Sequence, residues 1–215
     1  MQKNQHALPS YIRQATIEEL PEIVRVHQAA FPAFFLTLAG PAFLREYYRQ
    51  VLIAPGGILL VSEQQGIIVG FVAGFVNPEQ FYRDMRANKW RLAFPLLARV
   101  CVCPRLLPRI LVNFLRVRRN SDQLRPYPGT AAELSSIGVD PAYGGRGAGK
   151  LLVAQFLQES ADLGAGYVTL TTDTHENESV NRFYLKLGFR LLETFTQADG
   201  RVMNGYAIAL NQVNT

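Results

Sequence analysis

The sequence predicts a single-domain α/β (α+β) fold in which helices flank a central sheet. A strand, two helices and a hairpin come first, and strands and helices alternate in the second half. The chain has 215 residues, so one domain covering 1–215 is expected. Apolar residues make up 48% and charged residues 18%, which allows a sizeable core and excludes a disordered chain.

The first part of the chain carries clear helix and turn signals. Thr16 and Glu19 are spaced as a capping box, and Pro41 suits the first turn of a helix. Residues 64–66 separate two β-rich runs, which predicts a hairpin. The expected elements are a strand over 11–15, helices over 16–30 and 41–51, and strands over 58–63 and 67–76.

The segment 79–127 interrupts this order and is expected to form a basic helical insertion between the third and fourth strands. Apolar residues between Leu106 and Leu115 recur at helical spacing. Residues 81–125 hold eleven basic and two acidic side chains, a net charge of +9, so the rest of the chain carries −4. Three roles stay open: contact with an anionic acceptor, contact with an anionic membrane surface, and packing on the core or on a second subunit of a homodimer.

The second half alternates between strand and helix patterns. Apolar runs bounded by turn residues predict strands, and amphipathic stretches predict helices. The expected strands cover 131–139, 167–172, 189–196 and 202–210, and the expected helices cover 147–163 and 178–187.

Several classes of protein are disfavoured by composition. The chain has no run of 18 apolar residues, and its polar start lacks a secretory apolar region. Cys101 and Cys103 suit neither a disulfide framework nor a zinc site, so no metal is expected. The aromatic residues of the basic segment form no evident stacking platform, so no nucleic acid is expected. A cytoplasmic protein is therefore predicted.

A glycine-rich segment at 144–150 lies between a predicted strand and a predicted helix. Glycines let backbone N–H groups approach a ligand, and the helix N-terminus favours an anion, so a phosphate site is predicted. The spacing excludes a dinucleotide loop, since Lys150 stands where its third glycine would be. Leu151 weakens a P-loop, because it lacks the hydroxyl that holds magnesium, and a P-loop phosphotransferase is the runner-up enzyme class.

Two separate motifs carry a resemblance to a known family. After a strand ending in Val139, Gly147 and Gly149 have the spacing [QR]-x-x-G-x-[GA], with Gly144 where Gln or Arg is usual. A second motif downstream is matched by Asn177, Val180, Phe183, Tyr184, Lys186, Gly188 and Phe189. Together these motifs make the chain similar to the GCN5-related N-acetyltransferase (GNAT) superfamily, in which the first motif is the pyrophosphate loop. The resemblance covers 10–80 and 129–212 and leaves out the basic segment.

The resemblance implies a mixed, mostly antiparallel sheet of six to seven strands and acetyl-CoA as the co-substrate. It implies that Tyr184 protonates the departing thiolate and that the fourth strand carries the cofactor where it separates from the fifth. Asn177 is expected to contact the cofactor or to cap its helix. The residues expected to bind the cofactor are Ile137, Gly138, Val139, Gly144, Gly145, Arg146, Gly147, Ala148, Gly149, Lys150, Asn177 and Tyr184.

The attacking amine needs a base, and Glu133 is the candidate. It precedes Val139 by six residues in the fourth strand, a spacing seen in some members of the superfamily. With a period of two, Glu133, Ser135, Ile137 and Val139 are expected to share one face. His175 and a water relay remain alternatives. An acceptor pocket could be lined by Tyr11, Phe31, Phe34, Phe35 and Tyr47.

The function expected from this resemblance is transfer of an acetyl group, by direct attack, onto the primary amine of a small molecule. Amino sugars and anionic amines are candidate acceptors. A protein or peptide N-acetyltransferase is the alternative. A non-catalytic acyl-CoA sensor is the hypothesis from a different class, and the presence of both Glu133 and Tyr184 disfavours it.

Overall fold

The computed structural model describes residues 11–32, 34–102, 126–197 and 200–210, and these residues form a seven-stranded sheet. The strand order is β1-β2-β3-β4-β5-β7-β6, and all neighbouring pairs are antiparallel except β4 and β5. This confirms the predicted mixed, mostly antiparallel sheet. The strands are β1 (Tyr11–Gln14), β2 (Gly57–Gln64), β3 (Ile67–Val76), β4 (Thr130–Val139), β5 (Ala165–Asp173), β6 (Arg190–Thr196) and β7 (Val202–Ala209).

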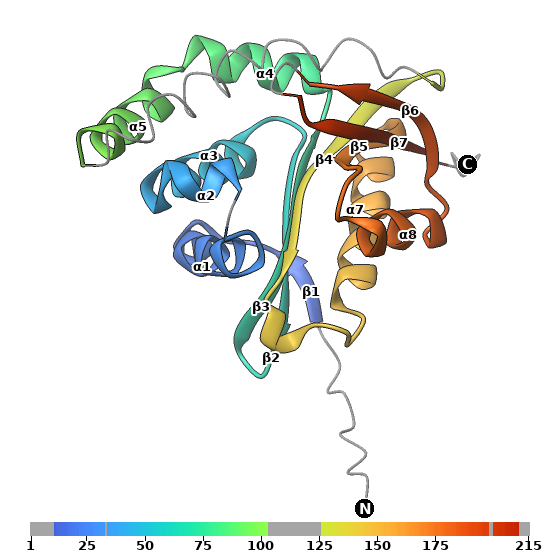
Figure 1. Ribbon diagram of the computed structural model, residues 1–215, viewed down its shortest axis with the longest axis horizontal. Helices are drawn as coiled ribbons and strands as arrows, with labels where there is room; N and C mark the ends of the chain where they lie inside the picture. Colours follow the sequence, from blue (N-terminus) through green and yellow to red (C-terminus); the bar gives the residue numbers. More distant parts are fainter. Residues whose placement is uncertain (1–10, 33, 103–125, 198–199, 211–215) are drawn as a thin grey trace, which may run out of the picture.

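Helices cover both faces of the sheet (Figure 1). One face carries α1 (Leu20–Ala30), α2 (Phe35–Ala39) and α3 (Pro41–Ile53), and the other carries α7 (Ala148–Asp162) and α8 (Glu178–Lys186). The short helix α2 was not predicted. Within the described residues, no helix combines the length and the apolar character needed to cross a bilayer.

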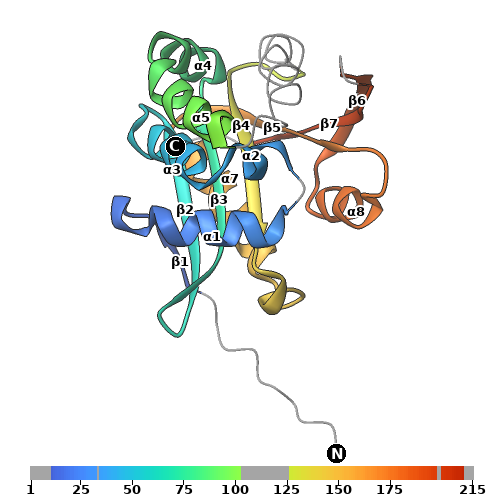
Figure 2. The same cartoon turned by 60° about the vertical axis from the view of Figure 1, so that its left-hand side comes forward.

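The predicted insertion between β3 and β4 is helical where the structure describes it. It begins with α4 (Pro78–Ala87) and α5 (Trp90–Val102), and α5 packs on α3. In Figure 1, α4 and α5 lie above α2 and α3, on the side of the sheet that also carries α1, and in Figure 2 α4 is again at the top. The predicted helical stretch from Leu106 to Leu115 lies outside the described residues.

Two apolar clusters hold these layers together. One lies between the sheet and α1, α3 and α4, and includes Ile23, Leu44 and Phe81. The other lies between the sheet and α7 and α8, and includes Leu152 and Tyr184. Each cluster buries the apolar stripe of its helices, which is why the amphipathic patterns in the sequence located the helices well.

The sheet opens between β4 and β5. The two strands pair only from Thr130, opposite Ala165, to Glu133, opposite Thr169. Beyond this point β4 continues beside β3, and β5 continues beside β7. Among the strands that the structure describes, none therefore pairs with this edge of β4 over its second half.

A β-bulge interrupts β4 at the same point. Ser136 pairs with Ala73 and Leu134 pairs with Gly74, so Ser135 has no partner residue in β3. A Cβ atom on Gly74 would lie 2.1 Å from the carbonyl oxygen of Glu133, so the bulge requires glycine opposite it.

The bulge makes part of the predicted face pattern wrong. Glu133 and Ser135 share the face toward α3 and α4, as expected, but Ile137 and Val139 pack against the cluster under α7. The extra residue reverses the alternation of side chains, and Ser136 joins Glu133 and Ser135 on the face toward α3.

Beneath this face of β4 lies a buried histidine. His27 in α1 is 2% exposed, and its Nδ1 is hydrogen-bonded to the Tyr48 hydroxyl at 2.6 Å. Tyr48 in turn donates to Ser136 Oγ at 3.2 Å. Burial lowers the pKa of His27 to about 4 from its usual 6.5, so the imidazole is neutral at physiological pH.

This burial predicts a pH-dependent stability. The unfolded chain takes up a proton at His27 below pH 6.5, whereas the folded chain resists it down to pH 4. The free energy of unfolding should therefore fall by about 2 kcal/mol between pH 7 and pH 4.5 from this group alone. Urea unfolding of the wild type and His27→Gln at both pH values measures it. Equal losses in the two proteins would contradict the prediction.

Candidate active site

The glycine-rich segment is held at its start by a carboxylate. Asp140 Oδ1 accepts a hydrogen bond from the Ala142 N–H at 3.0 Å, and Oδ2 accepts one from Arg25 of α1 at 2.7 Å. Arg25 and this N–H bond lower the pKa of Asp140, so the carboxylate stays charged. The loop that follows is exposed, with φ angles of 73° at Gly145 and 85° at Gly147. Glycine adopts these values without strain.

The loop leaves an open cradle of N–H groups at the start of α7. Gly147 precedes the helix, and the first bond of the helix runs from Leu151 N–H to the Gly147 carbonyl at 3.2 Å. The N–H groups of 148–150 therefore have no acceptor within the helix. No described atom lies within 4 Å of a Cβ atom placed on Gly145 or Gly147, so a ligand can approach this backbone.

The other predicted residues of the loop differ in what they offer. Arg146 and Lys150 are exposed, and the Arg146 guanidinium lies 5.5 Å from the Tyr143 ring centroid. Gly144 N–H donates to the Pro141 carbonyl at 3.2 Å, so this group is already engaged. The loop thus combines free backbone donors with two cations, an arrangement suited to a pyrophosphate.

The unpaired edge of β4 presents backbone groups from alternate residues. Asp140 N–H donates to the Val69 carbonyl of β3 at 2.8 Å. Because polar groups alternate in direction along a strand, those of Gly138 also point to β3, and those of Ile137 and Val139 point into the opening. Gly138 was predicted to bind the cofactor through its backbone; its polar groups serve the sheet instead, which corrects that part of the prediction.

The first turn of α7, the end of β4 and helix α8 meet at Gly149. A Cβ atom on this glycine would lie 3.7 Å from Phe183 Cζ and 3.8 Å from Val139 Cγ2. The two motifs of the sequence are therefore adjacent in space. Because Phe183 and Val139 both lie beside Gly149, the second motif, which includes Tyr184, lies next to the open edge of β4.

Tyr184 packs in the cluster between the sheet and α7 and α8. It is 5% exposed, and the rings of Phe183, Phe189 and Tyr206 surround it with centroids 5.3–6.2 Å away. Burial raises its pKa, so the phenol keeps its proton at neutral pH. Among the described residues, none hydrogen-bonds to its hydroxyl, which leaves that proton available to a ligand.

Asn177 precedes α8 but its side chain does not cap the helix, so that predicted role is wrong. It donates instead to Thr172 Oγ1 and to the Asp173 carbonyl, at the end of β5. Sequence reasoning missed Asn181, whose Oδ1 accepts hydrogen bonds from Asn204 at 3.1 Å and from Tyr206 at 2.8 Å. Together these amides fasten α8 to β5 and β7, and their position within the second motif was the available signal.

Glu133 lies on the opposite face, toward the helices that precede β4. Its Oε1 accepts a hydrogen bond from the Tyr82 hydroxyl of α4 at 2.6 Å. Next to it, Tyr47 of α3 donates to Ser135 Oγ at 3.0 Å. Burial raises the pKa of Glu133, and the bond from Tyr82 opposes that rise. A carboxylate with a raised pKa takes up a proton more readily than an ordinary one, which suits it to proton transfer.

The residues predicted to line an acceptor pocket are divided by the fold. Tyr47 belongs to the Glu133 face, whereas Tyr11 is exposed on the edge strand β1 and is not part of this face. Phe34 is half-exposed, and the Arg201 guanidinium lies 5.7 Å from its ring centroid. Arg201 also pairs with Asp173, so this contact links the β5 end to the loop before α2.

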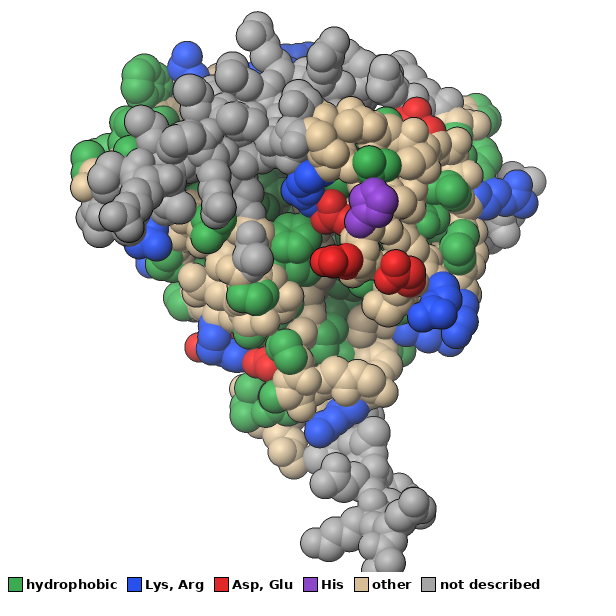
Figure 3. All heavy atoms as spheres, viewed as in Figure 1, with side chains coloured by type: hydrophobic (Ala, Val, Ile, Leu, Met, Phe, Trp, Pro, Cys, Tyr) green, Lys and Arg blue, Asp and Glu red, His purple; other side chains and the backbone are tan. Residues whose placement is uncertain are grey.

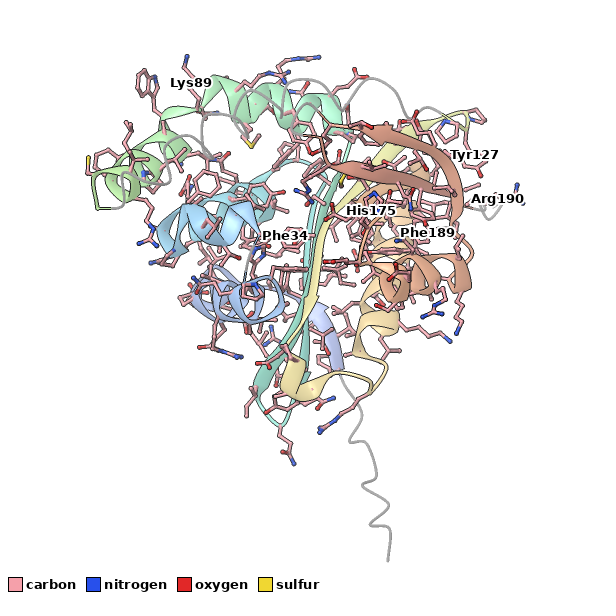
Figure 4. The ribbon with its side chains drawn as sticks, viewed as in Figure 1. Phe34, Lys89, Tyr127, His175, Phe189 and Arg190 are labelled. Carbon is pink, nitrogen blue, oxygen red and sulfur yellow. The ribbon has the colours of Figure 1, made fainter. Side chains whose placement is uncertain are left out.

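His175 is exposed in the loop between β5 and α8. Figure 4 shows it on the α8 side of β4, with Phe34 on the side of α1 and α2. Figure 3 shows acidic side chains beside the histidine on this face. His175 thus lies on the opposite side of β4 from Phe34, while Glu133 is the carboxylate on β4 itself. Within the described ranges, no three His, Cys, Asp or Glu side chains are grouped as a metal site.

A cradle of N–H groups at a helix start, beside an unpaired strand edge, is suited to a ligand that carries phosphate groups. In the sequence comparison, residues 109–189 match the model of the Acetyltransferase (GNAT) family. The match covers 81 of the 215 residues, so the chain is similar to the GNAT family over this segment, which contains both motifs.

Individual relatives are distant. The mycothiol acetyltransferase of Nocardia farcinica is 28% identical over 147 residues, which cover 64% of this chain and 47% of that protein. The chain thus matches about half the length of this relative. The polyamine N-acetyltransferase of Drosophila melanogaster has a TM-score of 0.60 at 21% identity, covering 94% of this chain and 100% of that one. The structure of yncA from Salmonella typhimurium, which holds its cofactor acetyl-CoA, has a TM-score of 0.58 at 16% identity, covering 96% of each chain.

Proposed function

We propose that the chain is an acetyl-CoA-dependent N-acetyltransferase that acts on the primary amine of a small molecule. The observation that carries the proposal is the opening between β4 and β5, which has the N–H cradle at one end and Glu133 at the other. Tyr184 and Glu133 approach it from opposite faces of the sheet. A co-substrate in the opening would thus meet an acid on one side and a base on the other.

The residues present fit acetyl-CoA. The N–H groups of Gly145, Gly147, Ala148 and Gly149 would hold the pyrophosphate, with Arg146 and Lys150 adding charge. The outward N–H and C=O groups of Ile137 and Val139 would pair with the amides of the pantetheine arm. An N–H of the same edge would polarise the thioester carbonyl. Asn177 would act on the cofactor only through the position of α8, because its amide is engaged with β5.

Acetyl-CoA would supply an activated acyl group, and side chains of the protein would accept and donate the protons that move during its transfer. The amine nitrogen bonds to the acyl carbon while the carbon–sulfur bond breaks. Glu133 takes the proton that the amine loses, directly or through a water molecule. Tyr184 donates its hydroxyl proton to the departing sulfur. Burial raises the pKa of Tyr184 and keeps its hydroxyl protonated at neutral pH, whereas the Tyr82 bond opposes the rise that burial causes in the pKa of Glu133.

A small-molecule acceptor is supported by the partly buried Glu133, which no described cation pairs. The ammonium form of an acceptor would supply the missing counter-charge. Relatives with small acceptors by name, a mycothiol acetyltransferase and a polyamine acetyltransferase, point the same way. A panel of polyamines, amino sugars, phosphorylated amines and peptide N-termini separates this proposal from a protein acetyltransferase. Free thiol released from acetyl-CoA is the readout, and a protein that binds acetyl-CoA but releases no thiol with any amine would be a sensor.

Replacing Glu133 by glutamine should lower kcat/KM by about 10²- to 10⁴-fold, because the attacking amine loses its base. The initial rate of thiol release measures the effect. Glu159→Gln, on the far helix α7, is the matched control and should keep wild-type rates. Wild-type turnover in Glu133→Gln would disprove the role, and a large loss in His175→Ala would then assign the base to His175.

Replacing Tyr184 by phenylalanine should lower kcat by about 10²-fold and leave the affinity for coenzyme A almost unchanged. The ring stays packed between Phe183, Phe189 and Tyr206, and only the proton donor is lost. Stopped-flow thiol release and calorimetric titration with coenzyme A separate the two quantities. Unchanged kcat would exclude the acid role.

We also propose that α5 rests on an anionic membrane surface. Trp90, Phe94 and Leu97 are 73%, 78% and 58% exposed and recur at helical spacing on one side of α5. Lys89 and Arg91 are exposed at the start of this face, and no acid lies within α5. The excess of positive charge over 81–125 favours an anionic bilayer over a second copy, since two copies would repel each other.

Binding to vesicles that contain an anionic lipid should shift the tryptophan emission to the blue. The chain has one tryptophan, Trp90, so the signal reports on this face alone. Binding should vanish with neutral vesicles and at about 0.5 M salt. Phe94→Ser should weaken it, whereas Leu151→Ser, at an exposed apolar site on α7, should not. A blue shift without vesicles, together with a dimer by sedimentation, would instead show a homodimer interface.

A further inference from the structure

We propose that Tyr82, which the insertion contributes through α4, is a positioning residue that holds Glu133 in its working orientation and stabilises its carboxylate by a hydrogen bond. The inference rests on the proposed function and extends it, since it makes the start of the insertion part of the acceptor site. The observation behind it is the bond from the Tyr82 hydroxyl to Glu133 Oε1, 2.6 Å long and 51 residues apart in sequence.

Helix α4 is anchored to the sheet so that Tyr82 has little freedom to move. Asn77 N–H donates to the Ala131 carbonyl of β4 at 2.8 Å, and its side chain accepts from Gln80 N–H at 3.2 Å as the helix cap. Phe81 stacks on Phe75 of β3 at a centroid distance of 3.8 Å. Tyr82 meets the same ring edge-on at 5.4 Å. Ring packing on β3 and the backbone hydrogen bond to β4 therefore fix the position of the Tyr82 hydroxyl next to Glu133.

The groups around Glu133 make Tyr82 its particular partner. On α3, Tyr47 donates to Ser135, and Tyr48 donates to Ser136 and is bonded to the neutral His27 of α1. Opposite Glu133 in the sheet are Phe75 of β3 and Thr169 of β5, neither of them charged. Within the described part of the chain, Tyr82 is thus the hydrogen-bond donor that reaches the carboxylate.

The protonation states agree with this role. Burial and the nearby Glu133 raise the pKa of Tyr82 well above 10, so its hydroxyl is protonated and donates at all physiological pH values. A bond donated to a carboxylate favours its ionised form. Burial favours the neutral form of Glu133, so loss of the tyrosine hydroxyl would leave burial unopposed and would raise the pKa of Glu133 further.

The test compares the pH profile of kcat/KM in the wild type, Tyr82→Phe and Tyr47→Phe. In Tyr82→Phe the acid limb should move up by about one pH unit, with the rate recovering at higher pH. In Tyr47→Phe, which alters the bond to Ser135 and not the one to Glu133, the limb should stay in place. A role of Tyr82 in packing alone would lower the rate equally at all pH values, and that result would overturn the inference.

A second measurement does not depend on turnover. Carbon-13 NMR of the glutamate carboxyl groups, with Glu133→Gln to assign the signal, should show Glu133 titrating about one pH unit higher in Tyr82→Phe. An unmoved titration would overturn the inference even if the enzyme is active. If this shift is seen but Glu133→Gln turns over normally, the inference about Tyr82 stands and Glu133 as base is excluded. Melting temperatures of the variants identify any that fail to fold.

Discussion

The site depends on one constraint, the end of pairing between β4 and β5 after Glu133. A strand inside a sheet satisfies its backbone groups on both sides, and β4 loses one side over its second half. Unpaired N–H and C=O groups are costly to bury, so this edge has to meet water or a ligand. The sheet thereby has unpaired backbone N–H and C=O groups at its centre, where a ligand can pair with them. The glycine loop, Tyr184 and Glu133 are all placed around this edge.

The bulge at Ser135 gives the same strand a second role. It places Glu133, Ser135 and Ser136 on one face, and each receives a tyrosine hydroxyl, from Tyr82, Tyr47 and Tyr48. Polar groups on an otherwise apolar strand are tolerated because each has a partner. The polar side chains of β4 therefore lie on one face of the sheet, where each has a hydrogen-bond partner. Ile137 and Val139 make apolar contacts on the other face.

The sequence predicted what depends on local pattern. The glycine loop, the amphipathic helices and the hairpin of β2 and β3 follow from short-range rules, and their predicted boundaries differ from the observed ones by at most two residues, apart from the first helix, whose α-helical part begins only at Leu20. The bulge was not predictable, because it follows from Gly74 on a different strand. The Tyr82 bond to Glu133 was also invisible, because 51 residues separate the two partners. Asn177 stands at a helix start, as the motif indicated, yet Thr172 and Asp173 compete successfully for its amide.

The insertion has two parts, and only the part that begins at Asn77 is tied to the residues around Glu133. From Asn77 to Tyr82 the chain is tied to Ala131, Phe75 and Glu133, so insertions or deletions here would displace a hydroxyl from its carboxylate. Beyond α4, the path back to β4 carries no such link within the described residues up to 102. The distal part is therefore free to change in length and in charge without moving the Tyr82 hydroxyl away from Glu133.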